Sequence, residues 1–203
     1  MNRGLSLVEL LLALTVSGLV AAGVAAMLGG VATGIAVGTD ARTGMLASGV
    51  IQGRFVEAIS PGACVLGAEE HRAALWLGDM TPGGQVEPSE CAWMIYDPDL
   101  GLLSIERVVF PDDWSPIQRA KFDRPLRPNT DPFPLLDEAR EAGIVEREIL
   151  ADSIADAQFG IEKSPLEQSQ VRLDLWLDLP TGEWPMSAIA VFMAYDVPRE
   201  WTP

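Results

Sequence analysis

Residues 1–20 read MNRGLSLVELLLALTVSGLV, and they open a long apolar segment that carries one acidic side chain, Glu9. No charged residue follows Glu9 until Asp40, so residues 10–39 exceed the roughly 20 apolar residues that span a bilayer as a helix. A charge in hydrocarbon costs about 2.5 kcal/mol or more, so a carboxylate here indicates a functional group with a partner. The segment therefore predicts a membrane helix whose acid takes part in an interaction.

Two ordinary explanations leave the acid unexplained. A cleaved secretory signal has an apolar core of about 7 to 15 residues, and the core here is about twice that long. A plain membrane anchor accounts for the length of the segment but gives no reason for Glu9.

A third pattern accounts for the acid. Arg3 makes the leader basic, Gly4 ends it, an apolar residue follows at Leu5, and Glu9 is fifth when counted from Leu5. In this register the segment resembles the type IV pilins and the pseudopilins of type II secretion, although Leu5 stands where Phe is usual. The resemblance implies that a prepilin peptidase cuts between Gly4 and Leu5 on the cytoplasmic side and methylates the new amine. It also implies a single-pass inner-membrane protein with its C-terminal head in the periplasm.

The resemblance further implies the partners and the role of the acid. Expected partners are other pilin or pseudopilin subunits, the prepilin peptidase and the inner-membrane assembly platform. The ammonium of Leu5 in one subunit would lie beside Glu9 of a neighbour, and pairing in low dielectric offsets the desolvation of both charges. The alternative is a snorkelling or protonated acid in a plain anchor.

Small residues recur at every fourth position of the apolar segment. They are Gly18, Ala22, Ala26, Gly30, Gly34 and Gly38. Such a row permits close contact with a partner helix. The general abundance of Gly and Ala in the segment is an equally good explanation, and because interior Gly costs about 1 kcal/mol relative to Ala, residues 29–38 could be loosened.

Composition divides the chain into four segments. They are a leader over residues 1–4, the membrane and assembly half of a helix over 5–39, its amphipathic half over 40–60, and an acidic head over 61–203. In the amphipathic half, Met45, Ile51, Phe55 and Ile59 are expected on one apolar face that packs on the head. Pro61 then stops a helix of about 55 residues.

The head is expected to consist mainly of strands. Apolar or alternating runs occupy residues 72–78, 91–97, 102–110, 170–179 and 187–197, with turns at 98–101 and 180–185. Residues 135–157 are predicted to form one or two helices, and the proline-rich residues 111–134 a long loop. The predicted fold class is α+β, with a long N-terminal helix packed on a mainly antiparallel, pilin-like head. The order of these strands resembles the J-type minor pseudopilins and the W-type minor pilins.

The net charge of −15 lies wholly in the head, because the first 60 residues carry three acidic and three basic side chains. This argues against nucleic acid as a partner.

The single histidine, His71, is interpreted as a surface residue at a strand edge, so no catalytic triad is expected. Asp97 and Asp99 could supply two oxygens to calcium, but the loop does not match an EF-hand, and they are interpreted as turn residues. No metal and no cofactor are expected.

The two cysteines, Cys64 and Cys91, form a candidate disulfide because the implied periplasmic space is oxidising. Such a bond would constrain the unfolded head by roughly 3 to 4 kcal/mol. Two separate buried thiols are the alternative.

Two classes of function follow. The first is a non-enzymatic minor pilin or pseudopilin subunit that supports protein secretion or pilus biogenesis from an envelope filament or its tip. The second is a membrane-tethered extracytoplasmic binding or enzymatic domain. Of the six tryptophans, Trp184 and Trp201 are candidates for contacts and the others for packing.

Overall fold

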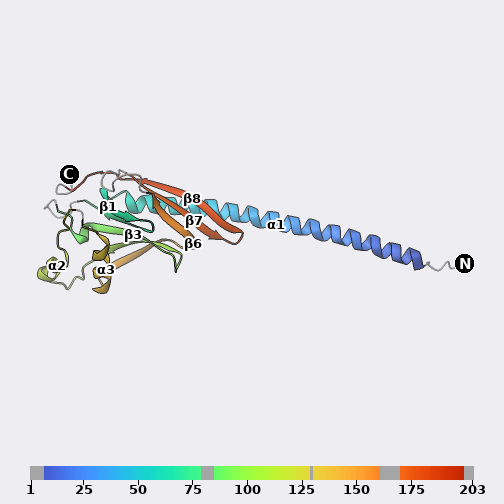
Figure 1. Ribbon diagram of the computed structural model, residues 1–203, viewed down its shortest axis with the longest axis horizontal. Coiled ribbons are helices and arrows are strands. Elements are labelled where there is room, and N and C mark those ends of the chain that lie inside the picture. Colours follow the sequence, from blue (N-terminus) through green and yellow to red (C-terminus); the bar gives the residue numbers. More distant parts are fainter. Residues whose placement is uncertain (1–6, 79–84, 129, 161–169, 199–203) are drawn as a thin grey trace. The chain divides into compact units, whose positions relative to one another are not determined.

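The computed structural model describes residues 7–78, 85–128, 130–160 and 170–198, which belong to two compact units, residues 1–43 and 44–203. Helix α1, Leu7–Ile59, is the first element and runs through both units (Figure 1). The remaining elements form antiparallel sheets and short helices, so the predicted α+β class is confirmed. The predicted long N-terminal helix is confirmed as well, since α1 has 53 residues.

Residues 11–35 of α1, in the first unit, carry no charged side chain on any side of the helix. Their large apolar side chains, from Leu11 to Ile35, are exposed. Within the described residues, one helix, over Leu11–Ile59, is long and apolar enough to cross a membrane by length and composition. A helix that is apolar all round needs an apolar environment, and near an N-terminus it can serve as a membrane anchor or as a signal.

The second unit contains two antiparallel sheets. The five-stranded sheet has the order β1-β2-β3-β4-β5, with β1 Cys64–Glu69, β2 Arg72–Trp76, β3 Cys91–Asp97, β4 Leu102–Val108 and β5 Val145–Ala151. The three-stranded sheet has the order β6-β7-β8, with β6 Ile154–Gly160, β7 Gln170–Leu179 and β8 Gly182–Val191. The short helices are η1 Pro88–Glu90, α2 Pro116–Phe122 and α3 Phe133–Glu141.

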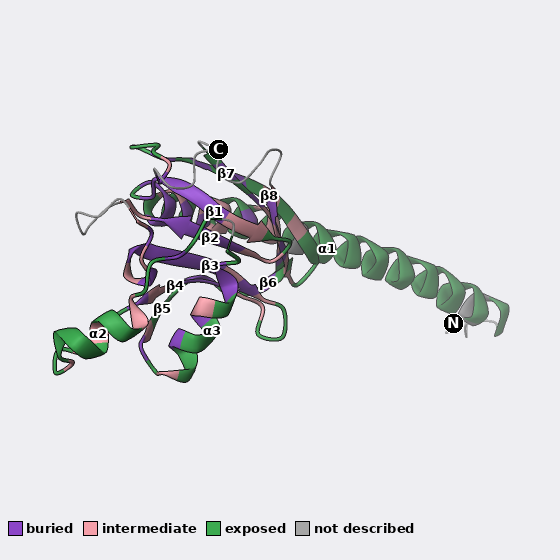
Figure 2. Cartoon of the chain, turned by 60° about the vertical axis from the view of Figure 1, so that its left-hand side comes forward, coloured by how far each residue is buried: buried purple, intermediate pink, exposed green. Residues whose placement is uncertain are grey.

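The C-terminal turns of α1 pack on the sheets within the second unit. One hydrophobic cluster joins Ile51, Phe55 and Ile59 to inward side chains of both sheets, and Figure 2 shows these buried turns beside buried strands. The prediction for Met45 is wrong, because its side chain is 66% exposed. Gly44 is buried instead, one residue earlier and so about 100° away around the helix.

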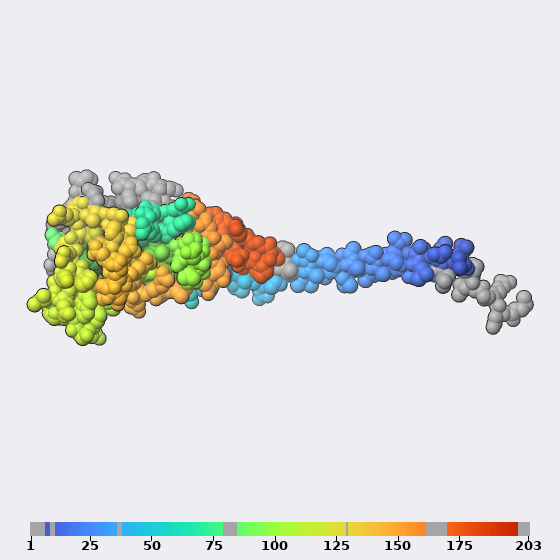
Figure 3. Space-filling view, turned by 60° about the horizontal axis from the view of Figure 1, so that its bottom comes forward, coloured from blue at the N-terminus to red at the C-terminus, as the bar shows by residue number. Residues whose placement is uncertain are grey.

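The other face of the five-stranded sheet has a second hydrophobic cluster. Helix α3 contributes Phe133, Leu136 and Ala139 to it, and the segment that leads from β4 to β5 forms the surface of the unit there (Figure 3). The Nε1 of Trp93 donates a hydrogen bond to the carbonyl oxygen of Pro132 at 3.1 Å. The five-stranded sheet is therefore covered on both faces.

Two predictions about the segment over 111–157 need correction. Helix α3 ends at Glu141, before Gly143 with its positive φ of 67°. Residues 145–151 form strand β5 and residues 154–157 belong to strand β6 instead of a helix. The charged sequence of β5 does not show the apolar alternation that is typical of a strand. It adopts strand conformation because it pairs with β4. The predicted loop contains α2, whose N-terminus carries a capping box between Ser115 and Gln118 that the sequence already shows.

The hairpin of β7 and β8 follows its predicted alternation closely. Val171, Leu173, Leu175 and Leu177 are buried, while their neighbours in β7 are exposed or half-buried. Strand β8 begins at Gly182 and ends at Val191, so it includes residues 182–185 of the predicted turn and ends before residues 192–197 of the predicted strand.

Candidate functional site

The predicted processing and assembly residues lie at the start of the chain. Gly4 and Leu5 are outside the described residues. Glu9 lies in the first turns of α1, where the backbone is helical as predicted. The roles expected for these three residues remain predictions.

The row of small residues forms an open face of α1. A Cβ added at Gly18, Gly30, Gly34 or Gly38 would meet no atom within 4 Å. Ala22 and Ala26 are exposed as well. The row is thus as open as the rest of residues 11–35, including Gly23 and Gly29, and its role in packing remains a prediction.

Threonine hydroxyls in the apolar part of α1 are satisfied within the helix. Thr15 donates to the carbonyl oxygen of Leu12 at 2.9 Å, and Thr33 donates to that of Gly29 at 2.8 Å. Thr39 makes the same kind of bond to Ile35. In hydrocarbon every polar group must find its partner in the protein, and these bonds meet that requirement. Sequence reasoning missed them, although isolated threonines in an apolar run are a readable signal.

Within the second unit, α1 and β8 approach each other closely at Gly44 and Trp184. A Cβ at Gly44 would lie 2.7 Å from Cδ2 of Trp184, so only glycine lets the indole lie this close to the helix. Trp184, near the start of β8, was predicted as a contact residue, and the contact it makes is within its own chain. Trp201 lies outside the described residues.

The structure contradicts the candidate disulfide. Cys64 and Cys91 are free, buried thiols. Cys64 pairs with Trp76 across β1 and β2, and Trp76 pairs with Cys91 across β2 and β3. The two cysteines are thus two strand spacings apart, about 9.5 Å, whereas a disulfide needs Cα atoms about 4.4 to 6.8 Å apart. This register instead produces the alternative, two separate buried thiols.

Burial also governs the chemistry of the thiols. It raises the pKa of Cys64 to about 12, with a smaller contribution from the charge of Asp196. Burial likewise raises the pKa of Cys91 well above its ordinary value. Both side chains are therefore protonated, unreactive thiols at neutral pH.

The histidine and the turn aspartates have structural roles. The Nδ1 of His71 lies 2.9 Å from the carbonyl oxygen of Ala157, so this nitrogen donates the hydrogen bond and ties the β1–β2 turn to β6. Asp97 Oδ1 accepts hydrogen bonds from the backbone N–H groups of Asp99 and Leu100. The interpretation of these aspartates as turn residues is confirmed. In the part of the chain that the structure describes, no three His, Cys, Asp or Glu side chains are grouped so that they could hold a metal ion.

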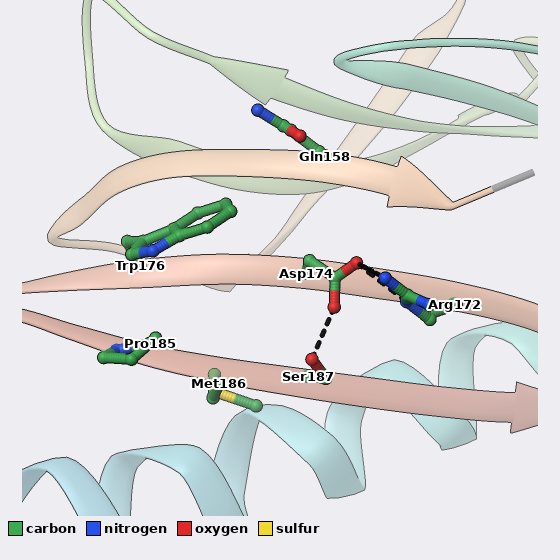
Figure 4. Close-up of a pocket in the computed structure, with 7 residues that line it drawn as sticks. All are labelled: Gln158, Arg172, Asp174, Trp176, Pro185, Met186 and Ser187. Atoms are coloured by element: carbon green, nitrogen blue, oxygen red, sulfur yellow. Dashed lines mark hydrogen bonds and ion pairs between the residues drawn. The ribbon is translucent and has the colours of Figure 1, made fainter.

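The three-stranded sheet has a polar hollow on the face that points away from α1. The residues that line a space of about 480 Å³ (Figure 4) are Gln158, Arg172, Asp174, Trp176, Pro185 and Ser187 on this face, together with Met186, which packs against the hydrophobic cluster toward α1. Asp174 Oδ2 lies 2.7 Å from Nε of Arg172, and the hydroxyl of Ser187 donates to Oδ1 of Asp174. The bond from Arg172 and then that from Ser187 hold the pKa of Asp174 below its usual value.

The hollow presents both polar and apolar surface. The ion pair of Arg172 and Asp174 lies beside the half-buried indole of Trp176. The sequence shows the alternation that places these side chains on one face of β7, but it does not show which residues of β6 and β8 lie beside them.

Comparison with known proteins found no family model, no curated protein and no solved structure that matches this chain.

Proposed function

We propose that this chain is a non-enzymatic minor pilin or pseudopilin subunit, which a prepilin peptidase processes and which assembles into, or at the tip of, a type II secretion pseudopilus or a type IV pilus. The observation that carries the proposal is the register of Gly4, Leu5 and Glu9 in front of an unbroken apolar helix. The pilin-like arrangement, in which the end of that helix packs on antiparallel sheets, supports it.

The apolar half of α1 has two properties that suit storage in a membrane and later assembly. Its large apolar side chains are exposed in the single chain, so it needs lipid or neighbouring helices around it. Its small-residue row is open along one side. In the filament, helices of neighbouring subunits would supply the apolar surroundings that lipid supplies before assembly.

The orientation follows from charge. Arg3 precedes the apolar segment, and a basic residue there keeps the leader on the cytoplasmic side. The acidic head then lies in the periplasm. Its partners under this proposal are other subunits, the peptidase and the inner-membrane assembly platform.

Glu9 would act in assembly and not in folding. The second unit begins at residue 44 and has its own hydrophobic clusters, so the head does not depend on this acid. A carboxylate in hydrocarbon is costly until it pairs with an ammonium, so it favours the assembled state.

The proposal is tested first on the mature N-terminus. Mass spectrometry of protein from the native envelope should find a chain that starts at Leu5 with one added methyl group. A Gly4→Phe variant should keep its leader, because a bulky side chain blocks the cleft of the protease, whereas the leader variant Asn2→Ala should be cut normally. An intact Met1 in the wild type, or cleavage near residue 30, would point to an anchor or a secretory signal.

The assembly role of Glu9 is tested by crosslinking in cells that produce the protein. Glu9→Ala should lower crosslinking to partner subunits while the protein stays cleaved, folded and in the membrane. Glu57→Ala removes the same charge at an exposed position in the second unit and should leave the crosslinks unchanged. Undiminished crosslinks in Glu9→Ala at wild-type protein levels would exclude the assembly role.

A further inference from the structure

The outer face of the three-stranded sheet differs from every other sheet face in the described residues, because no element of those residues covers it. The five-stranded sheet carries hydrophobic clusters on both faces. The three-stranded sheet buries only the face toward α1, with Val171, Leu173 and Leu175. Five side chains of its outer face, near the β7–β8 turn, are called the acidic face here: Asp156, Trp176, Asp178, Glu183 and Pro185.

Trp176 and Pro185 form the apolar centre of the acidic face. They are direct partners across β7 and β8, and Asp156 is the partner of Trp176 on the other side. Proline is tolerated within β8 because β8 is an edge strand, where its missing N–H costs no ladder hydrogen bond. Proline also discourages pairing of another strand at this edge, so the flat face is the available surface.

Asp178 and Glu183 form an unfavourable cross-strand pair. They are direct partners across β7 and β8, which places their Cβ atoms about 5 Å apart, and like charges in such a pair are destabilising. Both side chains are exposed. In the described part of the chain neither has an ion-pair partner. A cation from outside the chain would relieve this repulsion.

The neighbouring acids are already engaged, which isolates this pair further. Asp174 is held by Arg172 at 2.6 Å, and Asp156 accepts hydrogen bonds from the backbone N–H of Ala157 and from Nε2 of Gln158. Within the described residues, Asp178 and Glu183 are the carboxylates of the acidic face that make no hydrogen bond and no ion pair, on a chain whose net charge is −15.

We propose that the acidic face is a docking surface for a basic segment of a partner protein. A guanidinium or ammonium group would lie over the ring of Trp176 in a cation–π contact and pair with the carboxylates of Asp178 and Glu183. The hollow beside Trp176 accepts the aliphatic part of the same side chain. Charge complementarity selects this partner and excludes anionic lipid and nucleic acid. The inference does not rest on the proposed function.

Calorimetric titration of the full-length protein in nonionic detergent tests the proposal. The probe is the peptide acetyl-Gly-Arg-Ser-Arg-Gly-amide, and its control is the same peptide with citrulline in place of arginine, which keeps the shape and removes the charge. The arginine peptide should bind, its affinity should fall as salt is raised, and the citrulline peptide should bind at least about tenfold more weakly.

Two variants locate the site. Asp178→Asn with Glu183→Gln should lower the affinity at least about tenfold and should not lower the thermal stability, because it removes a repulsion. The matched control, Glu138→Gln with Glu141→Gln, removes the same charge from exposed positions on α3 and should bind like the wild type. Trp176→Leu keeps an apolar residue in β7 and should also weaken binding, through loss of the cation–π contact.

Three results would overturn the proposal. Equal affinity for the citrulline peptide would show that charge is not recognised. An equal loss in the α3 control would show attraction to the whole acidic chain instead of this face. No binding of the arginine peptide at low salt would exclude the surface as a site for basic segments.

Discussion

At the scale of single residues, Gly44 and Gly49 in the amphipathic half of α1 show that the role of a residue in packing is not visible from the helix alone. Gly44 and Gly49 both lie within a continuous helix, where glycine costs about 1 kcal/mol relative to alanine. A Cβ at Gly44 would collide with Trp184, whereas a Cβ at Gly49 would meet no atom within 4 Å. The same substitution should therefore have opposite effects at the two positions.

We predict that Gly44→Ala destabilises the second unit by about 1 kcal/mol net, because overpacking against the rigid indole exceeds the gain in helix propensity. Gly49→Ala should stabilise it by up to about 1 kcal/mol. Thermal unfolding of the purified protein, followed by tryptophan fluorescence, measures both. A double variant of Gly44→Ala with Trp184→Leu should lose less than the two single changes predict in sum. Stabilisation by Gly44→Ala would contradict the contact.

At the scale of elements, helix α3 is tied to the five-stranded sheet by one buried acid. Glu106 on β4 is 2% exposed. Its carboxylate accepts hydrogen bonds from Nε and Nη2 of Arg140 on α3 at 2.7 and 2.9 Å, and from Nε of Arg147 on β5 at 2.6 Å. Burial raises the pKa of Glu106, but the bonds from Arg140 and Arg147 outweigh it, so the pKa lies below its usual value.

This carboxylate should make the head sensitive to acid. Because the folded pKa of Glu106 is lowered, its contribution is fully present above the unfolded value of about 4.3 and is lost as pH falls through the folded value. We predict that Glu106→Gln costs about 2 kcal/mol at pH 7, and that the difference from wild type shrinks below pH 4. Denaturant unfolding at several pH values checks this.

The matched control for Glu106 is Glu148→Gln. Glu148 pairs with Arg107 at 3.6 Å, and its side chain is 63% exposed. An exposed pair contributes little, so this variant should change the unfolding free energy by less than about 1 kcal/mol. An equal loss of unfolding free energy in the two variants would show that the contribution of Glu106 does not depend on its burial.

At the scale of the whole molecule, the second unit is stabilised by two hydrophobic clusters and not by a crosslink. The clusters lie on opposite faces of the five-stranded sheet. Cys64 and Cys91 belong to the cluster on the face that α3 covers, as free thiols separated by Trp76. Reductant should therefore leave the stability of the protein unchanged.

We predict that peptide mapping of envelope protein without reductant finds both cysteines as thiols. An alkylating reagent at pH 8 should not modify Cys64 until the head is unfolded, because its pKa near 12 keeps the buried sulfur protonated. The unfolding temperature should be the same with and without reductant. A Cys64–Cys91 peptide in the map would require a register of β1, β2 and β3 different from the one described.

Properties that depend on nearby residues could be predicted from the amino-acid sequence. The apolar run of residues 10–39 already predicts a long helix, and the alternation in residues 170–179 already predicts a half-buried strand, because periodicity along the chain determines which side chains share a face. The register of Gly4, Leu5 and Glu9 supplies the functional hypothesis in the same way, without any tertiary contact.

What only the tertiary structure decided depends on residues that are distant in sequence. Strand β5 reads as charged and helical, and pairing with β4 makes it a strand. The separation of the two cysteines depends on the register of β1, β2 and β3. Gly44 is buried instead of Met45 because Trp184 packs against it. The acidic face forms because β8 lies beside β7. Periodicity carries no information about such pairings, because register and packing are chosen by the whole core at once.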